Sequence, residues 1–311
     1  MKLIKHSLLL VCSFSLVGCF NSEPLLTSTV ERWIDNPTIN EIKVVIDGTE
    51  LIIPAKSGVN YTFSYGKHTL SYNNESLNFI AKPSIFNNTG LINPTQSNYF
   101  LYTTLYTTSD GADEIYNKLI SKYMNFVSII VDGEKRRIEM PVKVINDVFI
   151  ERRTNFWDYS VDEPLPNSVT MHRKGQYRSQ KVKLYRENSF IETLKSAGVT
   201  EEISFPYQPR NFSELKKYSI SNLDINSIKC PAGRDHMKKH LQDWHQLFSF
   251  TGKDFAIAYK KLISDETVQQ NYASLNECAG EKGIEQAYQN VMKSIEKMTN
   301  DTKQINFYIT D

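Results

Sequence analysis

The segment Lys43–Ile53, KVVIDGTELII, carries the clearest folding signal in this 311-residue chain. Two runs rich in β-branched residues flank Asp47-Gly48, a pair that tolerates the positive φ angles of a type I′ turn, so the segment predicts a β-hairpin. Aromatic residues then alternate over Tyr61–Tyr65, and another strand is expected over His68–Tyr72. Residues 31–82 are therefore expected to form a small antiparallel β module, either a sandwich or a partial barrel.

Residues 83–165 read as a second β-rich module with one inserted helix. Asn93–Thr95 repeats the Asn-Pro-Thr of Asn36–Thr38, and Phe126–Gly133 (FVSIIVDG) repeats an apolar run followed by Asp-Gly. Between them, Ser109–Met124 has helical spacing of its apolar residues. A degenerate repeat of the first module and chance similarity both explain the pattern. Chance is favoured, because both motifs are common turn formers.

Residues 166–225 read as an α/β connecting region. Lys181–Tyr185 alternates like a strand, and Ser189 with Glu192 forms a capping box at the start of a helix that Gly198 ends. Strand spacing then returns at Ile203–Phe205. A stretch rich in turn formers, residues 206–232, separates this region from the last module.

Residues 226–311 have the apolar periodicity of several short helices. Met237, Leu241 and Trp244 share one helical face, Val268 and Tyr272 fit another, and the strongest stripe covers residues 284–295. Alternation over residues 305–309 predicts a final strand that returns to a sheet. The sequence as a whole predicts an α+β protein, with β-rich N-terminal modules, an α/β middle and a short-helix C-terminal module.

The first residues of the chain carry an export signal. A basic start precedes the apolar run Ser7–Val17, which has the length of a secretory signal core and is too short to span a bilayer. The run ends in Leu16-Val17-Gly18-Cys19, which resembles the lipobox of bacterial lipoproteins. The resemblance implies that residues 1–18 are a signal peptide. It also implies that Cys19 becomes the lipidated, acyl-carrying first residue, anchored to the membrane.

Further expectations follow from the same resemblance. Residues 19–30 would be a tether, and Phe20 occupies the position where lipoproteins kept at the inner membrane typically have Asp, so the outer membrane is the expected location. An ordinary signal peptide ending by chance in LVGC is the alternative. In addition, Trp33–Thr38 (WIDNPT) followed by Val45–Gly48 (VIDG) is similar to β modules of uncharacterised bacterial lipoproteins, a resemblance that implies no activity.

The cysteines that remain after such processing are Cys230 and Cys278. Two cysteines in an exported chain favour a disulfide, because the bacterial periplasm is oxidising. The competing interpretation is a nucleophilic Cys230 with His236 as its base, although an unpaired reactive thiol would be oxidised in this compartment.

The clustered residues of metal-ligand type are His236, His240 and Asp243, spaced to share one flank of a helix, whereas His245 projects elsewhere. Zinc needs three or four ligands, and the zinc-protease pattern H-E-x-x-H is absent. These three residues are therefore only weak metal candidates, and a polar flank beside the core is the favoured interpretation. The pair Asp162-Glu163 is interpreted as a solvated turn in the same way.

Composition excludes several partner classes. With 36 basic and 35 acidic residues, the chain has no electrostatic footprint for nucleic acid. It also lacks a glycine-rich nucleotide loop and a recognisable nucleophile motif, so no cofactor and no catalytic residue are expected. The leading hypothesis is a membrane-anchored envelope lipoprotein of Gram-negative type that binds or assembles envelope proteins or glycans without catalysis. The alternatives are an envelope hydrolase acting on cell-wall or glycan material through a dispersed site, and a metal-capturing lipoprotein.

Overall fold

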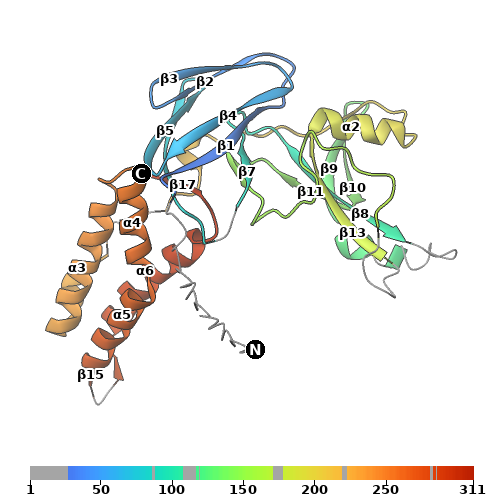
Figure 1. The fold of residues 1–311 in the computed structure, drawn as a ribbon. Helices are drawn as coiled ribbons and strands as arrows, with labels where there is room; N and C mark the ends of the chain where they lie inside the picture. The colour runs from blue at the N-terminus through green and yellow to red at the C-terminus, as the bar shows by residue number, and fades with distance from the viewer. Residues whose placement is uncertain are drawn as a thin grey trace, which may run out of the picture.

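The structure of this protein is a computed structural model with an α+β fold, as the sequence predicts (Figure 1). Strands make up the N-terminal part and helices gather in the C-terminal part. The described residues are 27–85, 88–107, 117–118, 120–170, 178–218, 223–280, 283–284 and 286–311.

The strands occur mainly in the first two thirds of the chain. They are β1 (Thr29–Asn36), β2 (Ile42–Ile46), β3 (Thr49–Ile53), β4 (Ser57–Ser64), β5 (Gly66–Tyr72), β6 (Glu75–Ala81), β7 (Gly90–Ile92), β8 (Tyr99–Thr107), β9 (Asn125–Val131), β10 (Glu134–Met140), β11 (Val142–Ile145), β12 (Phe149–Glu151), β13 (Arg178–Arg186), β14 (Ile203–Ser204), β15 (Ala279–Gly280), β16 (Gly283–Ile284) and β17 (Phe307–Thr310). The hairpin expected at Lys43–Ile53 is β2–β3, and both Asp47 and Gly48 have positive φ as the type I′ turn requires.

A central four-stranded sheet, in the order β12-β7-β1-β4, lies between two other sheets. The five-stranded sheet β17-β6-β5-β2-β3 packs on one face through a core that includes Ile34, Phe63 and Ile92. The three-stranded sheet β11-β8-β13 shares a core with the other face that includes Leu91 and Leu184. Leu91 and Ile92 serve opposite cores because successive strand residues point to opposite faces. The predicted sandwich of the first module thus exists, and strands from the rest of the chain extend both of its sheets.

The two Asn-Pro-Thr segments form the same turn. In each, the asparagine amide donates to the backbone oxygen four residues later, over 2.8 Å from Asn36 and 2.9 Å from Asn93. In each, the threonine hydroxyl donates to the asparagine oxygen, over 2.7 Å from Thr38 and 3.0 Å from Thr95. The two segments therefore share one turn structure, which common turn formers can adopt independently.

The strands around these turns also pair in the same order. We call strands β1–β5 the first β unit, and strands β7, β8 and β11–β13 the second β unit. The strand after the turn lies between two partners in each: β2 lies between β3 and β5, and β8 lies between β11 and β13. The strand before it, β1 or β7, pairs with β4 or β12. The Asp-Gly hairpins are not equivalent, however. β9–β10, which contains Phe126–Gly133, is an insertion between β8 and β11 and forms a separate sheet with β14.

Two expected helices differ from the sequence prediction. The helix expected to begin at Ser189 is α2 (Glu187–Ser196), and its N-cap is Arg186, which makes no side-chain cap hydrogen bond. The capping-box prediction was wrong because β13 runs directly into the helix. The helix expected over Ser109–Met124 lies largely outside the described residues, and its end is the 3-10 turn η1 (Ser121–Tyr123). Further 3-10 turns are η2 (Phe212–Glu214) and η3 (Ile225–Ser227).

The C-terminal helices are α3 (Pro231–Leu247), α4 (Gly252–Leu262), α5 (Asp265–Glu277) and α6 (Gln286–Thr302). Their buried stripes, with Met237, Leu241 and Trp244 on α3, pack against Ile80 and Tyr308 of the five-stranded sheet. The final strand expected over residues 305–309 is β17, which pairs antiparallel with β6. Figure 1 shows these helices below the blue strands of the first unit, with the second β unit to the right.

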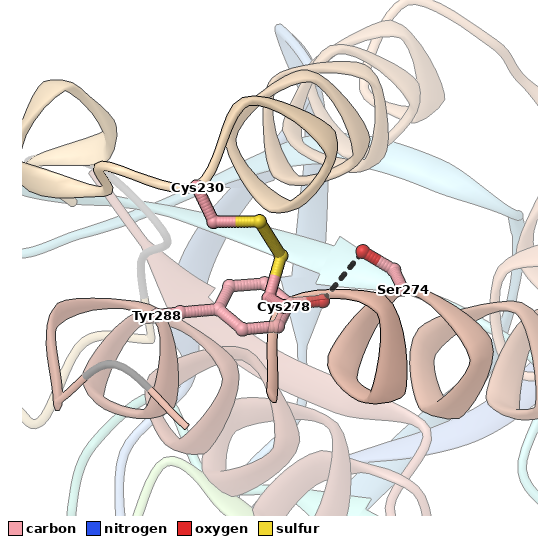
Figure 2. Close-up of a disulfide and its surroundings, with 4 residues drawn as sticks. All are labelled: Cys230, Ser274, Cys278 and Tyr288. Atoms are coloured by element: carbon pink, nitrogen blue, oxygen red, sulfur yellow. Dashed lines mark hydrogen bonds between the residues drawn. A yellow bond between two sulfur atoms is a disulfide. The ribbon is translucent and has the colours of Figure 1, made fainter. Parts of the chain in front are cut away.

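The disulfide Cys230–Cys278 is present and joins the residue before α3 to the residue after α5 (Figure 2). Tyr288 of α6 lies beside it and donates a hydrogen bond of 2.9 Å to the Ser274 hydroxyl. A Cβ on Gly233 would lie 2.7 Å from the Cys278 sulfur, so this packing needs glycine. Because its sulfur is bonded, Cys230 is not the free nucleophile of the competing interpretation.

Candidate functional site

A groove of about 620 Å³ runs between the C-terminal helices. Its volume lies within the usual range of ligand-binding pockets. One wall follows α6 from Gln289 to Asn300, a distance of about 16 Å at the helical rise of 1.5 Å per residue. The groove has an apolar surface framed by polar side chains. Its apolar lining is Ile85, Leu262, Ile263, Val268, Tyr272, Met292 and Ile295, and its polar lining includes Asn271, Gln289, Lys293, Glu296, Asn300 and Lys303.

Large apolar side chains around this groove are exposed to solvent. Tyr272 is 60% exposed, Ile85 50% and Val268 44%. The sequence placed Val268 and Tyr272 on the apolar stripe of a short helix, and α5 does carry them, but this part of the stripe lines the groove instead of a closed core. Grouped exposed apolar side chains with a polar rim are typical of a binding surface.

Of the histidines of α3, His240 lines this groove, and His236 contacts both His240 and the lining residue Asn271. The rings of His236 and His240 stack 6.2 Å apart, and His236 Nε2 lies 2.7 Å from the Asn271 oxygen of α5. The Trp244 indole donates to His240 Nε2 over 3.3 Å. Since Nε2 accepts this hydrogen bond, a neutral His240 carries its proton on Nδ1.

The charge of His240 is set by its surroundings. Burial, together with the nearby His236, lowers the pKa of His240 to about 4, so this side chain is neutral at neutral pH. His240 lines the groove as a neutral polar group. Asp243 is half-buried and His245 is exposed. Across the described ranges of the chain, no three His, Cys, Asp or Glu side chains are placed to hold a metal ion together.

A second, smaller cleft of about 350 Å³ is lined by residues of β1, of β7 and of the segment that follows β12. Trp33, Arg152, Trp157 and the acidic pair Asp162-Glu163 line it. That pair lies in an exposed turn, as the sequence predicts, and Arg186 donates to Asp162 over 2.6 Å. Among the described residues, no histidine lines this cleft.

Arg186 connects the cleft to a buried charge. Its guanidinium also donates to both carboxylate oxygens of Asp35, over 2.6 and 2.8 Å, and Asp35 is fully buried. The Tyr99 hydroxyl and the Trp33 indole donate to the same carboxylate over 2.5 and 2.7 Å. Asp35 and Arg186 lie 151 residues apart, so a single sequence gave no signal for this pair.

The predicted lipidation residue, Cys19, lies outside the described residues, as do the rest of the export signal and most of the tether. None of the helices in the described part of the chain is long and apolar enough to cross a bilayer. Comparisons with models of protein families, with curated proteins and with solved structures found no match to this chain.

Proposed function

We propose that this chain is a lipid-anchored lipoprotein of the Gram-negative cell envelope, at the outer membrane, and that it acts as a non-enzymatic binding or assembly module. The lipobox ending in Cys19 supports the anchor. The groove between the C-terminal helices supports binding and is the observation that carries the proposal. An exposed apolar surface of this kind loses contact with water when a partner covers it, which favours association.

The position of the anchor limits where the groove would act. Seven residues, Phe20–Leu26, separate the lipidated cysteine from Thr27, the first described residue, so the chain takes eight residue steps between them. At no more than about 3.5 Å per residue, this tether spans at most about 28 Å. The folded part of the chain would therefore work close to the membrane surface, where its partners are envelope components.

The groove suits an apolar segment of an envelope protein. Its wall along α6 is several helical turns long, and its polar rim offers hydrogen bonds beside an apolar surface. Grooves between helices commonly bind the apolar face of an amphipathic partner segment. Ion pairing contributes less, because Lys293 and Glu296 have opposite charges one turn apart on the same wall.

The anchor is tested by the intact mass of the membrane-extracted protein, with Cys19→Ala as the control. A lipid mass that is present in the natural chain and lost in the variant is the expected result. An unlipidated product that stays in the soluble fraction contradicts the anchoring proposal and makes a secreted protein the better starting point.

The groove is tested by photo-crosslinking in intact cells. A benzophenone amino acid replaces Tyr272, which is 60% exposed in the groove, or Phe126, which is 63% exposed on β9 and serves as a matched control. A discrete protein adduct is expected only from position 272. It should disappear with Val268→Lys in the groove and persist with Val144→Lys, a similarly exposed valine on β11. Adducts that are absent, or alike from both positions, contradict the proposal.

A further inference from the structure

The second cleft contains an arginine, Arg152, whose guanidinium is held in place through one of its three nitrogens. Arg152 is the residue after β12, and its backbone N–H donates to the Thr89 oxygen over 2.8 Å. Its Nε donates to the Trp157 backbone oxygen over 2.7 Å. Neither terminal nitrogen has a hydrogen-bond or ion-pair partner within the described segments. A guanidinium positioned in this way matches the two oxygens of a carboxylate with little further loss of freedom.

The opposite charge in this cleft belongs to Glu163. One of its carboxylate oxygens accepts the Ser160 backbone N–H over 2.5 Å, and no cationic side chain pairs with it in the part of the chain that the structure describes. The other two acids that line the cleft differ, because Asp158 pairs with Lys181 and Asp162 with Arg186. Arg152 and Glu163 are thus a cation and an anion that line one cleft and make no ion pair among the described residues, although Lys183 lies near enough to Glu163 to interact with it electrostatically.

Aromatic and apolar groups complete the lining. The Trp33 ring lies against Gly58, where an added Cβ would approach the indole to 2.4 Å, and its N–H donates to Asp35. The ring is therefore held in position by close packing and by a hydrogen bond. Trp157 and Leu91 are buried beside it and present apolar surface to the cleft.

We propose that this cleft binds a small zwitterion that carries both a carboxylate and an ammonium group, such as an amino acid or the end of a short peptide. The carboxylate binds to Arg152, the ammonium group binds to Glu163, and the apolar stem between them packs against Trp33. A phosphate group fits less well, because Asp162 and Glu163 place negative charge in the same small space. This site is separate from the groove between the helices and does not depend on it.

The probe is dialanine, titrated against the purified full-length lipoprotein and followed by ligand-observed NMR. Dialanine amide lacks the carboxylate and N-acetyl-dialanine lacks the ammonium group, so both are expected to bind at least tenfold more weakly. Arg152→Gln is expected to weaken dialanine binding at least tenfold and Glu163→Gln at least threefold, because each removes one charge-assisted contact.

Arg153→Gln is the matched control, since Arg153 Nε donates to Gln304 and this neighbouring arginine does not line the cleft. It should change dialanine binding by less than twofold. If Arg152→Gln does not fold, the two dialanine analogues and Glu163→Gln, a change at an exposed residue, still decide the matter. The proposal is overturned if dialanine does not bind at millimolar concentrations, if inorganic phosphate binds as tightly, or if Arg152→Gln and Arg153→Gln have equal effects.

Discussion

Opening the Cys230–Cys278 disulfide is expected to lower the free energy of unfolding by about 4 kcal/mol. The bond joins residues 48 positions apart, and the chain-entropy relation for a loop of this length gives a loss of about 14 cal/mol/K in the unfolded chain, or about 4 kcal/mol at 25 °C. In the folded chain the bond holds the start of α3 beside the end of α5, and both cysteines pack against the helical core.

The assay is urea unfolding followed by far-ultraviolet circular dichroism, because the disulfide lies among the C-terminal helices. Two independent changes should give the same loss: reduction of the natural protein, and the double variant Cys230→Ala/Cys278→Ala. Reductant should have no further effect on the double variant, which serves as its control. A loss below about 1 kcal/mol in both cases would refute the reasoning, because the unfolded chain would then gain little freedom from the open loop.

Three further outcomes follow from side chains already described. Gly233→Ala should lower the free energy of unfolding in urea by about 1 kcal/mol, because the added Cβ meets the Cys278 sulfur at 2.7 Å and this overpacking outweighs the gain in helix propensity. In a Cys278→Ala background the loss should vanish, and a loss that persists would contradict this cause. The folded-state pKa of His240 is about 4 against an ordinary 6.5, so the unfolded chain binds this proton at a higher pH than the folded chain does. Up to about 3 kcal/mol of stability should therefore be lost as pH falls from 6.5 to 4. Unfolding at several pH values should show a smaller loss for His240→Gln, and an equal pH dependence of stability in the variant and the natural chain would contradict this role of His240. Arg186→Leu leaves the carboxylate of Asp35 buried without its cation and should lower the free energy of unfolding, by heat or urea, by about 3–5 kcal/mol. A loss of stability near that of an exposed-site variant such as Lys43→Leu would show that Asp35 does not depend on this arginine.

The elements that the sequence predicts correctly depend on short-range patterns. The Lys43–Ile53 hairpin follows from alternation and an Asp-Gly turn, and the C-terminal helices follow from apolar stripes such as that of α3. Each pattern needs only the next few residues, because turn geometry and helical periodicity are local. The disulfide was predictable for a different reason, since few cysteines remained to be paired.

The shared central sheet could not be predicted in this way. Strands β1 and β7 pair in parallel, with Trp33 beside Leu91, although strands β2 to β6 separate them in the sequence. The repeated Asn-Pro-Thr was a visible signal, but the Asp-Gly hairpin nearest to it belongs to an insertion. The equivalent strands β11 and β12 carry no obvious sequence match, so the repeat becomes evident only from strand pairing.

The candidate sites could not be predicted because one sequence pattern is compatible with either a buried core or an exposed surface. Val268 and Tyr272 have helical spacing that fits a core stripe, and periodicity cannot tell a stripe covered by the protein from one left open to solvent. Asp162-Glu163 does lie in an exposed turn, but nothing in the sequence indicated that Arg186 on β13 joins Asp162 to the buried Asp35. Such contacts between distant segments depend on tertiary packing.

The buried pair Arg32–Glu151 explains why both sites must be tested in the full-length chain. Arg32 on β1 donates to Glu151 at the end of β12 over 3.2 Å, which joins the two β units. The other Glu151 oxygen accepts the backbone N–H groups of Asn306 and Phe307, at 2.9 and 3.0 Å. Removing the C-terminal segment would leave a buried carboxylate short of these donors and take β17 from the sheet. The groove needs the helices between these contacts and the cleft needs Arg152 beside Glu151, so loss of either function in a truncated chain would report loss of the fold.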